Sequence, residues 1–143
     1  MNRFATLFLA AVMASSAWAV SATACDKTSC EFKSGVYFKG LHDNTAIDQE
    51  FTVQMVVNGM NVQQAGELVE GTGHFHILID DAAVEQGEPV KKDATHLHFG
   101  KGQSEATLKL TPGEHTLTLQ FADGHHVSYG KLWSRTVPVY VKP

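Results

Sequence analysis

The sequence lacks most of the features that identify nucleic-acid-binding proteins, thiolate metal sites and common enzymes. Only two of its 143 residues are cysteines, too few for a four-thiolate zinc site. It has no basic cluster, and its 15 acidic residues outnumber its 11 basic ones, which argues against nucleic acid or an anionic membrane surface as a partner. It also has no nucleophile elbow, phosphate loop or paired-carboxylate arrangement that would point to a particular enzyme class.

Long apolar runs are absent except at the N-terminus. Arg3 is the only charge before residue 26, and an apolar stretch over residues 4–18 follows it. Residues 17–19 and 22–24 both fit an A-x-A cleavage pattern, and the stretch is short for a membrane span. We therefore expect residues 1–24 to be a bacterial signal peptide and the protein to be periplasmic. Residues 25–143 then form one domain with no transmembrane span.

The two cysteines stand at the start of this mature chain. In an oxidising compartment Cys25 and Cys30 are expected to form a disulfide. Two alternatives remain open at this point, a lipid anchor on Cys25 and a C-x4-C metal pair. Without Arg3 the mature chain has 10 basic and 15 acidic residues, a balance that suits cations as ligands.

The hydrophobic pattern is that of β-strands, with alternating apolar residues between Gly, Pro, Asn and Asp turns. Such short, closely spaced strands predict an all-β, immunoglobulin-like antiparallel β-sandwich in a single domain. Residues 61–72 and 80–94 are expected to be loops, with a candidate short helix at 82–86. Pro138 indicates that the last strand is an edge strand. The seven strands are expected at residues 35–38, 51–57, 74–79, 95–99, 106–110, 115–121 and 134–141.

Two H-x-H motifs are the strongest chemical signal in the chain. They contain His74 with His76 and His96 with His98. Residues i and i+2 of a strand share a face about 6.5–7 Å apart, so each pair can turn toward one metal ion. In both strands the apolar residues take the other parity, which places all four imidazoles on the face away from the core. If the two strands are neighbours, the four rings form one patch.

Several further residues are candidates for this site. His125 and His126 follow an Asp-Gly turn and are able to fold over a sheet face. Met60 lies in the loop before the first motif. It is either a thioether ligand, which would favour Cu(I), or a packing residue of the loop. His115 shares its parity with core residues, which favours a structural role. Asp80, Asp81 and Asp93 are either acceptors for ligand N–H groups or solvated turn residues.

Four segments of the chain resemble a bacterial exported domain family of unknown function. The resemblance runs from about Val36 to Val141 and implies export, but it assigns no activity. The family's middle histidine in GHHH is Phe75 here, as expected for a core-facing position. The matching segments are residues 71–80 (GTGHFHILID beside GTGHHHLLID), 95–105 (THLHFGKGQSE beside THIHFGKGQTE), 112–123 (PGEHTLTLQFAD beside PGKHTLTLQFAD) and the GM…AG residues 59–60 and 65–66.

These observations favour a periplasmic protein that binds copper or zinc through His74, His76, His96 and His98, in metal handling. Because imidazole binds metals in its neutral form, affinity is expected to weaken below about pH 6. A non-enzymatic sandwich that binds another periplasmic protein or an envelope component, with structural histidines, is the alternative. A metalloenzyme with an open coordination position is the third hypothesis.

Overall fold

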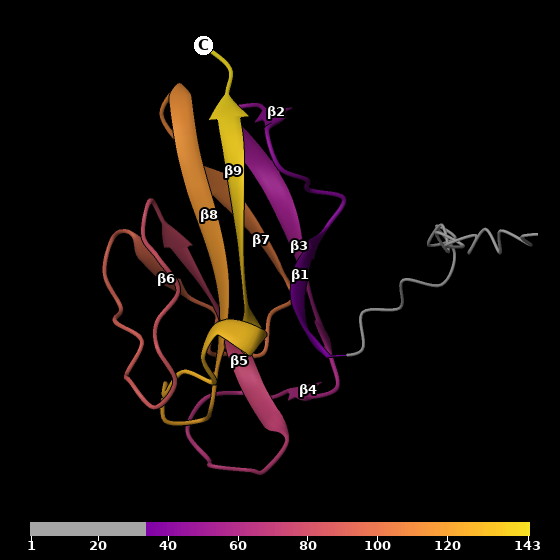
Figure 1. The fold of residues 1–143 in the computed structure, drawn as a ribbon, viewed down its shortest axis with the longest axis vertical. Helices are drawn as coiled ribbons and strands as arrows, with labels where there is room; N and C mark the ends of the chain where they lie inside the picture. The colour runs from indigo at the N-terminus through magenta and orange to yellow at the C-terminus, as the bar shows by residue number, and fades with distance from the viewer. Residues whose placement is uncertain (1–33) are drawn as a thin grey trace, which may run out of the picture. The chain divides into compact units, whose positions relative to one another are not determined.

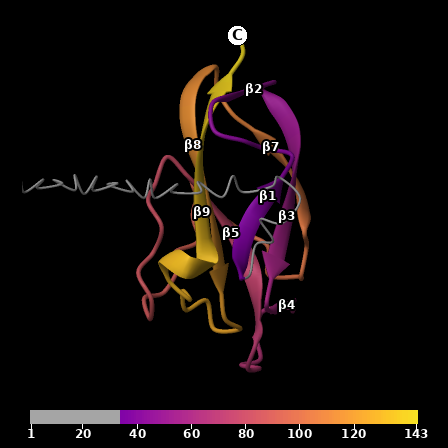
Figure 2. The ribbon, with the colours of Figure 1, turned by 45° about the vertical axis from the view of Figure 1, so that its right-hand side comes forward.

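The computed structural model of the protein describes residues 34–143. The expected signal peptide and the expected Cys25–Cys30 disulfide lie outside the described residues. The described chain forms a sandwich of two β-sheets, and Figure 2 shows these two layers from the side, with β8 and β9 in one and β3 and β7 in the other. Within residues 34–143 no helix is both long and apolar enough to cross a membrane.

The smaller sheet has three antiparallel strands in the order β1-β3-β7. The larger sheet has the order β2-β9-β8-β5-β4, and β6 also pairs with β5 (Figure 1). Its pairings are antiparallel except for the short β2–β9 and β4–β5 contacts. The strands are β1 (Gly35–Lys39), β2 (Thr45–Ile47), β3 (Glu50–Asn58), β4 (Asn61–Val62), β5 (Thr72–Ile79), β6 (His96–His98), β7 (Glu105–Lys109), β8 (Gly113–Ala122) and β9 (Ser134–Val141).

The main core lies between the two sheets and follows the alternation of the strands. Successive strand residues point to opposite faces, so every second apolar residue enters the core. Phe75 and Ile77 of β5 are fully buried there, opposite side chains of the smaller sheet such as Val53 and Met55. The remaining large-sheet core residues are Ile47, Leu117, Leu119, Phe121, Val137, Val139 and Val141.

The outer face of the larger sheet is covered as well. The segment from residue 80 to 94 folds over β5 and β8, where Val90 packs with Leu78 and Ala122 in a second, small apolar cluster. The backbone N–H of Val84 donates to Gln120 Oε1 at 3.1 Å, which holds this segment against the sheet. A side chain on the outer face of β5 is therefore buried, although it lies outside the main core.

The predicted all-β sandwich is confirmed for the described residues, and all seven predicted strands are present within two residues of their predicted ends. The short strands β2 and β4 were not predicted. The prediction of a short helix at residues 82–86 is wrong. That segment is an irregular stretch along the sheet, and its Val84 N–H donates to Gln120. β9 is not the outermost strand, since β2 pairs with its residues 139–141, just beyond Pro138.

Candidate metal centre

The pairing of β5 with β6 brings the two H-x-H motifs side by side. In this antiparallel ladder His76 lies opposite His98, and Leu78 lies opposite His96. Directly opposed residues share a face of the sheet. His74 lies two residues before His76 and shares that face. The adjacency of the two strands, on which a shared site depends, is therefore present.

A fourth imidazole comes from the turn that follows β8. Asp123 shapes this turn, because its Oδ1 accepts the backbone N–H groups of His125 (2.8 Å) and Val127 (2.9 Å). His126 adopts a left-handed backbone conformation, with φ of 68°, which is uncommon for a residue with a side chain. In this conformation the ring of His126 lies beside the rings of His74, His76 and His98.

The four rings of His74, His76, His98 and His126 form one compact group, here called the histidine cluster. All pairs of ring centroids lie between 4.7 and 5.8 Å apart. The Nε2 atoms of His74 and His76 are 3.0 Å apart, and those of His98 and His126 are 3.1 Å apart. His74, His76 and His98 can each offer one ring nitrogen such that the three nitrogens lie within 4.8 Å of one another.

Burial keeps the inner rings neutral. His74 and His76 have no exposed surface, whereas His98 and His126 are half-buried. Burial, together with repulsion from the neighbouring histidines, lowers the pKa of His74 to about 4 and that of His76 to about 2. Burial and the nearby His126 and Lys92 also lower the pKa of His98. Protons thus compete with a metal for the buried rings at a lower pH than the value near 6 expected from the sequence.

The hydrogen bonds within the described residues do not satisfy the cluster. Neither His74 Nδ1 nor His76 Nδ1 has a partner, although both atoms are buried. In the contact between their Nε2 atoms only one ring donates, so one Nδ1 carries an unpaired proton and the other an unpaired lone pair. An unsatisfied buried polar group costs about 1–3 kcal/mol. A cluster with a purely structural role is expected to avoid this cost.

The spacing of the ring nitrogens fits a metal ion. Two imidazole nitrogens bound to one tetrahedral zinc ion, each at about 2.0–2.1 Å, lie about 3.3–3.4 Å apart. The two Nε2 pairs of the cluster, at 3.0 and 3.1 Å, need to separate by only a few tenths of an ångström. The ligand nitrogens of the three strand rings, which lie up to 4.8 Å apart, need to draw together around the ion. A donor set made of imidazoles suits zinc, copper or nickel.

The cluster lies inside the segment that defines a protein family. Residues 53–142 match the family model described as a domain of unknown function, DUF4399. The chain belongs to the DUF4399 family. This confirms the resemblance to a domain family of unknown function, whose description assigns no activity. A comparison with curated proteins gives no match.

The DUF4399 region also contains His96, the fourth predicted strand ligand, but the structure places it outside the cluster. Its Nδ1 lies 2.8 Å from Asp93 Oδ1 and its Nε2 lies 3.3 Å from Asp81 Oδ2. The register explains this position, because His96 lies opposite Leu78, two residue pairs along the ladder from His76 and His98. Asp81 and Asp93 therefore serve His96, not the cluster.

The other candidates separate clearly. His125 is exposed, in contrast to its neighbour His126. Met60 packs against the main core, which agrees with its role as a packing residue of the loop. His115 has both ring nitrogens engaged, with Nδ1 2.7 Å from Asp80 Oδ2 and Nε2 3.0 Å from the Thr111 carbonyl oxygen. This agrees with a structural role for His115.

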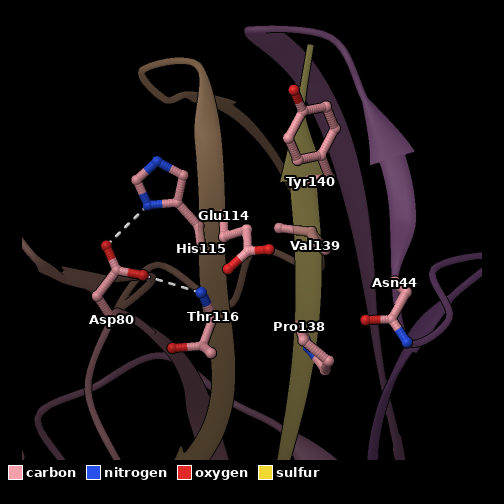
Figure 3. Close-up of a pocket in the computed structure, with 8 residues that line it drawn as sticks. All are labelled: Asn44, Asp80, Glu114, His115, Thr116, Pro138, Val139 and Tyr140. Carbon is pink, nitrogen blue, oxygen red and sulfur yellow. Dashed lines mark hydrogen bonds and ion pairs between the residues drawn. The ribbon is translucent and has the colours of Figure 1, made fainter.

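The Asp80–His115 pair lines a separate pocket of about 300 Å³ at β8 and β9 (Figure 3). Asp80 also accepts the backbone N–H of Thr116 at 2.8 Å. Desolvation raises the pKa of Asp80, but the hydrogen bonds from Thr116 N–H and His115 outweigh it, so the pKa lies below its usual value. The Asp80 and His115 side chains of this pocket are thus paired with each other, unlike the Nδ1 atoms of His74 and His76.

One residue that positions the cluster was not predicted from the sequence. A Cβ atom on Gly100 would lie 2.2 Å from both Cε1 and Nε2 of His98, a distance that real atoms do not tolerate. Only glycine leaves room for the His98 ring in its present orientation. A glycine two residues after His98 was visible in the sequence. Strand alternation alone does not show that the His98 ring lies against Gly100.

Proposed function

We propose that the protein is a periplasmic metal-binding protein that holds one copper(II) or zinc ion on the histidine cluster and acts in metal handling. The observation that carries the proposal is the convergence of four imidazoles from β5, β6 and the turn after β8. Their Nε2 atoms pair at 3.0 and 3.1 Å. Convergence of such distant segments on one point is typical of a ligand site.

Two further observations support metal over a purely structural cluster. Lowered pKa values keep His74 and His76 neutral at pH 7, and the neutral ring is the form that binds metal. The unpartnered Nδ1 atoms show that the hydrogen bonds among the described residues do not satisfy the cluster. The unpartnered Nδ1 atoms reduce the stability of the metal-free fold, and the lowered pKa values reduce it further below pH 6.5. A bound ion would offset these losses.

The donor set favours divalent ions. The cluster offers imidazole nitrogens, and Met60 packs against the core instead of supplying a thioether. Thiolate and thioether ligands select Cu(I), whereas imidazole suits copper(II) and zinc. Since affinities of nitrogen sites generally rise from zinc to copper(II), we expect copper(II) to bind more tightly. Export to the periplasm is inferred from residues 1–24 and from the resemblance to an exported domain family.

The experiment is calorimetric titration with zinc and copper(II) at pH 7.5. The parent is compared with two variants of adjacent residues, His126→Ala in the cluster and His125→Ala outside it. We expect one ion per chain with micromolar or tighter affinity in the parent and in His125→Ala. In His126→Ala the affinity should fall at least tenfold. Absence of binding in the parent, or equal affinity in both variants, would refute the proposal.

A further inference from the structure

Solvent reaches the histidine cluster from one side. His74 and His76 have no exposed surface, but His98 and His126 line a pocket of about 440 Å³. This volume falls within the usual range for small-molecule sites, about 300–1,000 Å³. A metal held by the cluster would therefore be able to meet an outside ligand through this pocket.

The pocket walls leave space next to the two rings. Ala65, Gly66 and Gly100 line it, so no large side chain stands there. Backbone hydrogen bonds hold these walls together, from Ala65 N–H to the Gly100 oxygen and from Gly66 N–H to the Gly124 oxygen, both at 2.9 Å. The space is thus part of the folded structure.

The charged groups of the pocket are both cationic. Lys92 and Lys101 line it together with Gln103. Among residues 34–143 neither lysine forms a salt bridge. Lys92 is close enough to His98 to contribute to the lowered pKa of that ring. Gln103 Oε1 accepts the Lys101 N–H at 2.8 Å, which directs the oxygen of this amide away from a ligand and leaves its NH₂ group as the donor.

We propose that this pocket binds a small carboxylate anion, which coordinates the metal of the histidine cluster and is neutralised by Lys92 and Lys101. The inference rests on the proposed metal site and extends it to a ternary complex. Two ammonium groups and a divalent ion repel a further free cation and attract an anion. Copper(II) and zinc both accept a further ligand beside three or four imidazoles.

The test uses the copper(II)-loaded protein with azide as the probe and acetate as the competitor. Azide bound to copper(II) gives a charge-transfer absorption band, which reports direct coordination. We expect the band to appear at millimolar azide and acetate to abolish it. Lys92→Gln/Lys101→Gln should weaken azide binding about tenfold, whereas Lys109→Gln, an exposed lysine on β7, should leave it unchanged.

Copper affinity and circular dichroism are measured on every variant, which separates loss of the anion site from loss of the metal or of the fold. Copper binding by the parent without an azide band, or an azide affinity unaffected by the double lysine substitution, would overturn the anion site and leave the metal site standing. A parent that binds no copper would overturn both proposals.

Discussion

The two buried histidines make the metal-free protein sensitive to mild acid. In the unfolded chain each ring titrates near 6.5, but in the fold the pKa is about 4 for His74 and about 2 for His76. Below pH 6.5 the unfolded state therefore binds more protons than the folded state, so stability falls as the pH falls. Each ring contributes about 1.4 kcal/mol per pH unit in this window, about 2 kcal/mol by pH 5.

Together the two rings should lower the free energy of unfolding by about 4 kcal/mol between pH 7.5 and pH 5. That is a large share of the stability of a small domain, about 5–15 kcal/mol. Urea denaturation of chelator-treated protein at several pH values measures it. With a slope of about 1.5 kcal/mol per molar, the midpoint should fall by about 2–3 M.

The control is a pair of variants. His74→Gln/His76→Gln removes the two most buried rings and should remove most of the dependence between pH 6.5 and 5, leaving the smaller part due to His98. His42→Gln, in an exposed loop, should retain the full dependence. If the parent and the double glutamine variant lose stability equally over this range, burial of the two rings is not the cause and the reasoning fails.

Three further predictions concern the site. Gly100→Ala should lower copper and zinc affinity at least tenfold by calorimetry, because its Cβ would lie 2.2 Å from the His98 ring; unchanged affinity would show that the ring is not fixed there. His96→Ala should leave metal affinity within about threefold but lower the midpoint of urea denaturation, since it removes a buried ring and its contacts to Asp81 and Asp93; a tenfold loss of affinity would place His96 in the site. Zinc at about 100 times its dissociation constant should stabilise the fold by about 2.7 kcal/mol, a rise in melting temperature of about 10 °C by scanning calorimetry; no rise would mean that the folded state does not bind it preferentially.

Alternation along single strands was readable from the sequence, and it placed Phe75 and Ile77 in the core and His74 and His76 on the opposite face. The identity of the fourth ring of the histidine cluster was not readable in this way. His96 and His98 share a face, but which of them meets His76 depends on the register between β5 and β6. A register shifted by two residues would have set His96 opposite His76 and His98 opposite His74, with no change in the pattern of either strand.

The burial of the cluster also escaped sequence reasoning. The residues that cover it belong to the segment 80–94 and to the turn containing His126, and neither has a periodic pattern. Their positions depend on individual contacts, such as Val84 N–H with Gln120 Oε1 and the Asp123 hydrogen bonds of the turn. Contacts of this kind join residues far apart in the sequence and have no local signature.

The most direct test of the metal site is X-ray absorption spectroscopy of the zinc-loaded protein at pH 7.5. We predict a first shell of nitrogen or oxygen at about 2.0–2.1 Å, with the outer-shell scattering of three or four imidazole rings. A sulfur shell at about 2.3 Å would instead assign the metal to Cys25 and Cys30. That result, or a spectrum with one imidazole or none, would contradict the histidine cluster as the binding site.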